Sequence, residues 1–409
     1  MEKIDDPALN HTSNYRWIIL GLTALTGFAV MGFPTTALAV LFSEVADDLQ
    51  LDLVQIGLVW GVGTVMGIFT TILAGSFIDY FGTRRSLVVL AILTGLTGLL
   101  RGFAVDFGTL FLFSFLFGMV QPVLPMNLIK LNRQWFAPQQ LGLASGIMSA
   151  GFATGLMLGS QLGAGVLSPA LGGWRGVLIF LGIISIVIGI LWFFVHPPLQ
   201  KSTASRPNVT SIFANLRHVM GYREVWIYGI AVFGVIGLMR GVIGYVPTYL
   251  REIGWAETIA DTPTSVFFLA SLIGVIPISY LSDRLGDRHI VMIIATLALS
   301  LGTGMMFFAQ DSYAGVMLAM VIGGFFFDSF MAMNGASVTE IEGMDIAVMG
   351  SALGFIGMMQ SVSATIAPPL GNALSALGLN TPFLLWAACG LLAAATLIVT
   401  YRRKKAKRP

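Results

Sequence analysis

The sequence predicts an all-α membrane protein with twelve membrane-spanning helices, arranged as two bundles of six. Composition and an internal repeat support this prediction. Of the 409 residues, 56% are hydrophobic and only 10% are charged, whereas a soluble domain carries about a quarter charged residues. A turn with the order Asp, Gly, Arg occurs twice between apolar runs, in GSFIDYFGTRRSL (75–87) and SYLSDRLGDRHIV (279–291). A lipid environment and duplication of one membrane unit explain these features together.

The membrane spans follow from the length of the apolar runs, because a spanning helix needs about 20 apolar residues. Twelve such runs occur, at 17–42, 54–78, 86–103, 110–131, 142–166, 176–195, 225–250, 264–281, 290–308, 314–337, 348–374 and 382–401. A long polar stretch separates the sixth run from the seventh. We therefore expect a six-helix bundle over 1–195, a cytoplasmic linker over 196–224, a second six-helix bundle over 225–401 and a basic tail over 402–409.

The positive charges predict the orientation of the chain. With both termini in the cytoplasm, 18 of the 22 Lys and Arg residues lie on the cytoplasmic side, and only Arg101, Arg175 and Arg251 lie outside. Cytoplasmic loops of membrane proteins carry this excess of positive charge. We therefore expect a multi-pass protein of the cytoplasmic (inner) membrane with both termini inside, whose basic tail contacts anionic lipid.

The two charged turns resemble the signature loop of the major facilitator superfamily, G-x-x-x-D-x-x-G-[RK]-x-[RK]. Two sets of residues match, which are Gly75, Asp79, Gly82, Arg84 and Arg85 in the first copy and Asp283, Arg284, Gly286 and Arg288 in the second. Thr83 stands where a basic residue is usual, and Ser279 replaces the leading Gly of the second copy. The resemblance implies the major facilitator fold, with two pseudo-two-fold related bundles around a central cavity. It also implies that these loops latch the two halves in the outward-facing state.

A second segment indicates which branches of the superfamily the chain resembles. The segment LNRQWFAPQQLGLASGIMSAGFATGLMLG (131–159) is similar to an R-x-W-F-x-P-x-x-x-G-x-A-x-G-I run of small-anion branches of the superfamily. These branches include the cyanate and nitrate permeases and the monocarboxylate and oxalate/formate porters. GGWRGVLIF (172–180) also resembles the Gly-Trp-Arg start of the sixth helix in these groups. The resemblance implies that the substrate is a small anion.

A ridge of small residues follows one face of the 142–166 span, where Gly151, Gly155, Gly159 and Gly163 recur every four residues. Small residues at this spacing let two helices approach closely. The ridge could serve static packing alone, or it could also let the two halves rock past each other. We expect a packing role that also serves the rocking motion.

Two charged residues, Arg240 and Asp328, lie near the membrane centre, in the seventh and tenth spans. A charge at this depth costs roughly 2.5–3.5 kcal/mol on insertion scales, so it is normally paired or faces a cavity. The family resemblance places the first, fourth, seventh and tenth spans around the central cavity. We therefore expect the two residues to interact, directly or through water or substrate.

Two interpretations of this pair compete. Arg240 and Asp328 could form a buried salt bridge that only joins two helices. Alternatively, Arg240 receives an anionic group of the substrate, while Asp328 takes and releases a proton. We favour the second interpretation, because a buried charge pair is a costly way to hold helices together. Four polar residues of the fourth, seventh and tenth spans complete the predicted substrate site, and these are Gln121, Asn127, Tyr245 and Asn334.

These features predict a secondary active transporter that moves a small organic anion by alternating access and couples its movement to protons. An exporter of amphipathic compounds or drugs is the alternative, and a sensor built on a transporter fold is a remoter one. Arg240 argues against a cationic cargo, and the short tails and linker argue against a signalling domain.

No enzyme activity, cofactor, metal site or nucleic-acid partner is expected. The single cysteine and the four histidines do not have metal-ligand spacing, and no phosphate-binding loop is present. We expect the protein to function as a monomer whose partners are the anion, protons and membrane lipid.

Overall fold

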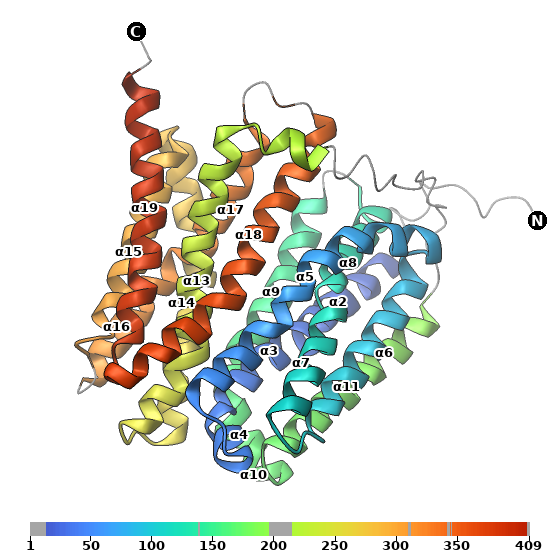
Figure 1. Cartoon of the computed structure of the whole chain (residues 1–409). Helices are drawn as coiled ribbons and strands as arrows, with labels where there is room; N and C mark the ends of the chain where they lie inside the picture. Colours follow the sequence, from blue (N-terminus) through green and yellow to red (C-terminus); the bar gives the residue numbers. More distant parts are fainter. Residues whose placement is uncertain are drawn as a thin grey trace, which may run out of the picture. The chain divides into compact units, whose positions relative to one another are not determined.

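The computed structural model describes residues 14–137, 140–195, 215–309, 312–341, 344 and 346–406. Within these ranges the chain is helical apart from short connections, and no strand occurs in them (Figure 1). The chain divides into two compact units, which are treated separately below. Unit 1 comprises residues 1–50 and 65–206, and unit 2 comprises residues 51–64 and 207–409.

The helices of unit 1 follow the first six predicted spans. They are α2 (Tyr15–Thr26), η1 (Gly27–Gly32), α3 (Phe33–Val40), α4 (Phe42–Leu49), the later part of α5 (Leu53–Phe81), α6 (Thr83–Arg101), α7 (Phe107–Val120), α8 (Val123–Trp135), α9 (Leu141–Leu162), η3 (Gly163–Leu167), α10 (Ser168–Leu171) and α11 (Trp174–Phe194).

Unit 2 contains the beginning of α5 and the helices of the last six predicted spans. These are α13 (Arg223–Glu252), α14 (Glu257–Leu285), α15 (Arg288–Met305), α16 (Tyr313–Phe325), α17 (Phe327–Thr339), α18 (Ile346–Ala373), η4 (Leu374–Leu377) and α19 (Pro382–Ala406).

Each of the twelve predicted spans coincides with a helix or with a run of consecutive helices. In the described part of the chain, ten helices are long and apolar enough to cross a membrane. The other two are α5, whose stretch Leu53–Val65 is a shorter apolar helix, and α18, which is 28 residues long. The expected linker falls largely on 196–214, outside the described residues. The expected boundaries between the two bundles stay a prediction. In the structure, residues 51–64 of α5 group with unit 2.

Four of the spans are interrupted where single helices were predicted, and one of them is the fifth, which passes from α9 into the π-helical turn η3 at Gly163. The first span passes through the π-helical turn η1 immediately before Pro34, because proline has no N–H for the normal α-helical bond. The fourth span breaks at Gln121 and Pro122, between α7 and α8. The tenth span breaks at Phe326, between α16 and α17. Backbone groups freed inside a membrane need other partners, so such breaks are candidate functional positions.

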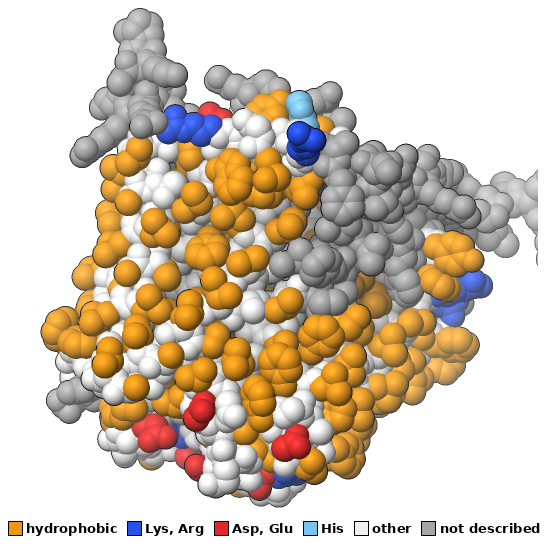
Figure 2. All heavy atoms as spheres, viewed as in Figure 1, with side chains coloured by type: hydrophobic (Ala, Val, Ile, Leu, Met, Phe, Trp, Pro, Cys, Tyr) orange, Lys and Arg blue, Asp and Glu red, His pale blue; other side chains and the backbone are white. Residues whose placement is uncertain are grey.

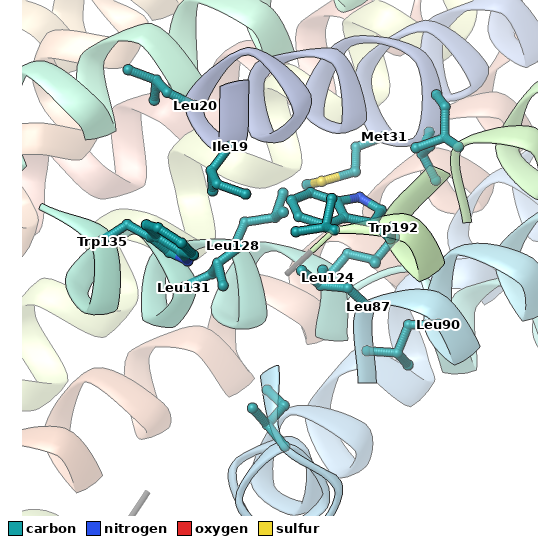
Figure 3. Close-up of a cluster of buried hydrophobic side chains, with 14 of the residues drawn as sticks. Ile19, Leu20, Met31, Leu87, Leu90, Leu124, Leu128, Leu131, Trp135 and Trp192 are labelled. Atoms are coloured by element: carbon teal, nitrogen blue, oxygen red, sulfur yellow. The ribbon is translucent and has the colours of Figure 1, made fainter. Parts of the chain in front are cut away.

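The core of unit 1 is filled by large apolar side chains from α2, η1, α6, α8 and α11. Figure 3 shows ten of them by label, which are Ile19, Leu20, Met31, Leu87, Leu90, Leu124, Leu128, Leu131, Trp135 and Trp192. Trp192 is fully buried, and its Nε1 donates to Thr26 Oγ1 at 2.9 Å. The only polar atom of this indole is thereby satisfied inside an apolar core.

The surface matches the apolar character of the spans. Figure 2 shows hydrophobic side chains along the length of the helices on the visible face, whereas charged side chains lie toward the helix ends. Many large apolar side chains are exposed in both units. A lipid environment accounts for this exposure, since a soluble monomer rarely shows apolar patches of this extent.

The helix α9 approaches the first span closely through the glycine ridge. A Cβ atom added to Gly155 would lie 2.5 Å from the carbonyl oxygen of Phe28, and one added to Gly159 would lie 2.5 Å from that of Phe33. Gly151 and Gly163 likewise face Ala24 and Val40. Backbone contact at this distance leaves no room for a side chain, so the ridge sets the spacing of α9 from α2, η1 and α3. Its role in rocking stays a prediction.

Replacing Gly155 by Ala should therefore destabilise unit 1 by about 1–3 kcal/mol, the usual cost of overpacking. Gly146 provides a matched control on the same helix, because no atom of the described residues lies within 4 Å of an added Cβ there. Gly146→Ala should leave the free energy of unfolding unchanged or raise it slightly, since Ala favours helix more than Gly does. Thermal unfolding of the purified variants in detergent measures both effects. Equal stability of the two variants would contradict the close approach.

Candidate functional site

Arg240 lies in the middle of α13 and contacts Trp60 of α5, and both residues belong to unit 2. The guanidinium lies over the indole ring, with Cζ 3.8 Å from the ring centroid. Arg240 Nη2 donates to the carbonyl oxygen of Trp60 at 3.2 Å, and Trp60 Nε1 donates to the carbonyl oxygen of Arg240 at 2.9 Å. Two hydrogen bonds and one cation–π contact therefore fix the arginine against α5.

Small and polar residues explain why α5 reaches Arg240. Gly244 lies one turn after Arg240, and an added Cβ there would lie 2.5 Å from Trp60 Nε1. The start of α5 is also bound to α18, where Asn372 Nδ2 donates to the carbonyl oxygen of Leu53 at 2.7 Å. The hydroxyls of Thr64 and Thr365 form a further bond between these helices at 2.9 Å. The indole is thus positioned by packing on two sides.

The charge of Arg240 is not neutralised by a carboxylate among the described residues, whose ion pairs within 4 Å do not include it. Its Nε is buried and has no hydrogen-bond partner. The indole covers one face of the guanidinium, whereas an oxyanion binds to the N–H groups in the plane of this group. The stacking partner therefore orients Arg240 without competing for an anion along the Nε edge.

Asp328 lies in the first turn of α17, just after the break at Phe326. Its backbone N–H donates to Ser271 Oγ of α14 at 3.1 Å, and the neighbouring Ser329 donates to the carbonyl oxygen of Gly274 at 3.1 Å. A carboxylate is favoured at a helix N-terminus because unpaired N–H groups give this end a partial positive charge. The break in the tenth span therefore explains how an acidic residue is accommodated there.

No direct ion pair joins Arg240 and Asp328 in the structure, although both residues are described. Arg240 contacts α5, while Asp328 bonds to α14. A link between the two through substrate or water, or in another state of the protein, stays a prediction.

The other predicted substrate contacts differ in their surroundings. Three of them are buried and donate to backbone carbonyls, namely Asn127 to Thr83 at 3.1 Å, Asn334 to Tyr228 at 3.3 Å and Tyr245 to Leu379 at 2.9 Å. The ring of Tyr245 also packs in an aromatic cluster with Tyr249, Phe383 and Trp386. These contacts favour a packing role for the three residues.

Gln121 is different, because it is only half-buried and lies at the break between α7 and α8. Its Nε2 has a long contact of 3.5 Å to the carbonyl oxygen of Met31, in the π-helical turn η1. A side chain held this weakly between two irregular backbone segments can bond to another group. Gln121 therefore remains the strongest predicted substrate contact in unit 1.

The glycines of the two charged turns have the backbone conformation that their role requires. Gly82 (φ 78°) is the single residue between α5 and α6, and Gly286 (φ 65°) ends α14. Positive φ values favour glycine over any residue with a Cβ atom. Thr83 is buried and donates to Gln134 of α8 at 2.9 Å, which explains why a long basic side chain is missing there.

The basic residues of the predicted latch contact their own units. Arg84 donates to the carbonyl oxygens of Trp192 and Phe193 at the end of α11, where the helix dipole favours a positive charge. Arg288 forms an ion pair with Glu340 at the end of α17. Arg85 and Arg284 are exposed, Gly75 lies in a part of α5 whose packing is not described, and the side chains of Asp79 and Asp283 lie outside the described residues. A latch between the two halves stays a prediction.

Sequence reasoning missed three buried charges, because it assigned Arg101 and Arg251 to outer loops and did not single out Asp261. Arg251 Nη2 of α13 lies 2.5 Å from Asp261 Oδ1 of α14, and Asp261 is fully buried. Arg101 is also buried, at 3% exposure. Side-chain direction could have identified the two arginines, since helical side chains point back toward the N-terminus and those at the C-terminal end of a helix therefore point into the span.

Substitution can distinguish a packing role, expected for Asn127, from a substrate-binding role, expected for Gln121. Asn127→Ala should lower thermal stability by roughly 1–3 kcal/mol, because the buried carbonyl oxygen of Thr83 loses a partner, while substrate affinity is retained. Gln121→Ala should leave stability nearly unchanged and weaken substrate binding. Unfolding curves and ligand titrations of both purified variants test this contrast. A loss of affinity in folded Asn127→Ala would contradict the packing role.

Comparison with known proteins agrees with this architecture. A family model described as Major Facilitator Superfamily matches residues 24–263 and 240–409. The chain is 24% identical to the probable nitrate/nitrite antiporter NarK1 of Thermus thermophilus, over 90% of this chain and 87% of that protein. It is 25% identical to the citrate-proton symporter of Salmonella typhi, over 92% and 91% of the two chains. The probable galactarate/D-glucarate transporter GudP of Escherichia coli is 24% identical, over 86% and 85%.

Solved structures show the same fold. The nucleoside transporter NupG has a TM-score of 0.77 with 16% identity, covering 95% of this chain and 99% of that chain. A bacterial homologue of the human lysosomal transporter Spinster, in an inward-facing and unoccupied conformation, has a TM-score of 0.76 with 14% identity, covering 96% and 98%.

Proposed function

The chain belongs to the Major Facilitator Superfamily, and we propose that it is a secondary active transporter that moves a small anion across the cytoplasmic membrane by alternating access. The proposal rests mainly on Arg240, a half-buried arginine in the middle of a spanning helix, whose charge no carboxylate among the described residues neutralises. A positive charge at this depth is costly unless it serves a ligand or a partner.

The geometry of Arg240 favours a planar oxyanion. Carboxylate and nitrate both present two oxygens in one plane, which matches the N–H fork of a guanidinium. Trp60 holds the plane of this fork through stacking, so the arginine is already oriented before the anion arrives. The names of the relatives support this class of substrate, since they include nitrate/nitrite, galactarate/D-glucarate and citrate-proton transporters.

We propose further that transport is coupled to protons through Asp328. This residue lies in unit 2, as Arg240 does, but it bonds to α14, whereas Arg240 bonds to α5. In the proposed cycle, a proton on Asp328 removes a negative charge that would otherwise compete with the substrate for Arg240. A citrate-proton symporter among the relatives supports this kind of coupling. The half-buried position of Asp328 is compatible with access of a proton.

Substitution of Arg240 tests the proposal. Arg240→Ala should lower the affinity for the transported anion roughly 10- to 100-fold, since a hydrogen bond to a charged group contributes about 1.5–3 kcal/mol. Arg240→Lys should also be impaired, because a point charge replaces the planar fork. Uptake into proteoliposomes is measured with labelled nitrate, nitrite, galactarate and citrate. It identifies the substrate and shows how far each substitution of Arg240 weakens its transport.

Arg133 provides a matched control for this experiment, because it is an exposed arginine at the end of α8. Arg133→Lys should transport at the wild-type rate. Normal uptake by correctly folded Arg240→Lys and Arg240→Ala would contradict the role of Arg240. Transport of amphipathic cations instead of anions would favour the exporter.

The proton-coupling role has its own test. Asp328→Asn mimics the protonated carboxyl group, so this variant should exchange labelled for unlabelled anion across the membrane at a near-normal rate. It should lose accumulation driven by an inward proton gradient, because the group that carries the proton is gone. Proteoliposomes with and without an imposed pH difference measure both activities. Undiminished gradient-driven accumulation by Asp328→Asn would assign coupling to another group.

A further inference from the structure

Arg101 is the last residue of α6, and its side chain is buried within unit 1 at 3% exposure. The side chain runs back along its own helix, since a Cβ atom added to Gly98 would lie 3.7 Å from Arg101 Nη2. The guanidinium lies over the ring of Phe117 of α7, with Cζ 3.9 Å from the centroid. A full positive charge is therefore enclosed between α6 and α7.

No hydrogen-bond acceptor or carboxylate is found for the Arg101 side chain among the described residues, and its Nε is buried without a partner. Buried guanidinium groups are normally paired, because an unpaired buried charge is strongly destabilising. The cation–π contact covers only one face of the group. It leaves the buried, in-plane Nε–H without a partner among the described residues.

Two acidic residues of unit 1, Asp48 and Asp106, have other partners than Arg101. Asp48 pairs with Arg175 and accepts from Trp174 Nε1 at 3.1 Å. Asp106 begins α7, where its carboxylate accepts the backbone N–H of Thr109 at 2.8 Å. The hydrogen bonds from Thr109 lower the pKa of Asp106.

Two buried hydroxyls belong to the same pair of helices. Thr94 lies on the face of α6 that carries Gly98 and Arg101, and its Oγ1 has no hydrogen-bond partner. Ser114 lies about one turn before Phe117 on α7, and its Oγ is also without a partner. Both hydroxyls can donate a hydrogen bond to an oxyanion. The two helices thus supply one guanidinium and two hydroxyls that have no hydrogen-bond partner among the described residues.

We propose that Arg101 forms a second anion-binding site, in unit 1, which takes an oxyanion between α6 and α7. The required ligand chemistry is a compact group with at least two oxygens in one plane, as in nitrate, a carboxylate or the phosphate of an anionic lipid. Arg101 belongs to unit 1 and Arg240 to unit 2. The inference does not depend on the proposed function, because a site on Arg101 can exist whatever Arg240 binds.

The experiment uses the full-length protein with Arg240→Ala, purified in non-ionic detergent, so that binding at Arg240 does not contribute. One arm titrates nitrate, galactarate and inorganic phosphate by calorimetry. The other arm adds phosphatidylglycerol and counts bound lipid by native mass spectrometry. We expect one equivalent of an oxyanion to bind in one arm or the other. Binding in the first arm identifies a soluble anion, and binding only in the second identifies a lipid headgroup.

Adding Arg101→Gln to this background should weaken that binding at least about 10-fold, because a charge-assisted bond is lost. Arg133→Gln, an exposed arginine, should leave it unchanged. Arg101→Lys keeps the charge and tests the site even if Arg101→Gln fails to fold, with affinity at least about threefold lower because the planar fork is lost. Unchanged binding in folded Arg101→Lys or Arg101→Gln, or no oxyanion bound in either arm, would overturn the proposal.

Discussion

Lipid imposes one constraint on which the rest of the structure depends: every backbone polar group must be satisfied inside the protein. The chain therefore forms helices, and these helices pack closely against one another without water between them. Unit 1 meets this constraint through the glycines of α9, which lie directly against the backbone of α2, η1 and α3. Unit 2 meets it through Gly241 and Gly371, which leave room for the fully buried indole of Trp386. Close approach fixes the positions of the helices, and those positions determine where a polar side chain can lie.

The same constraint makes buried charges informative. Arg251 and Asp261 neutralise each other, so they need no ligand to remain in the membrane. Arg240 and Arg101 instead lie over aromatic rings, at 3.8 and 3.9 Å. An aromatic face attracts a cation but satisfies none of its N–H donors. Both proposed anion sites use an arginine of this second kind, Arg101 in unit 1 and Arg240 in unit 2.

The sequence was sufficient for the helices and for the position of Arg240 in the middle of α13, because lipid forces each span to be long and apolar. It could not show which side chains around a helix face another helix and bond to it. Asn127 and Tyr245 lie at plausible depths, yet their hydrogen bonds go to Thr83 and Leu379. Arg101 has its Cα at the end of a span, yet its side chain returns to Gly98. Long-range contacts decide these directions, and hydropathy carries no information about them.

Trp60 links the proposed anion site to α5, because it lies in the part of this helix that groups with unit 2. The hydrogen bond from Arg240 Nη2 to the carbonyl oxygen of Trp60 depends on the position of this part of α5 against α13. Displacement of these two helices from each other would free the Nη2 donor for an anion. Under the proposed function, the affinity for the anion and the packing of α5 on α13 are then coupled through one side chain.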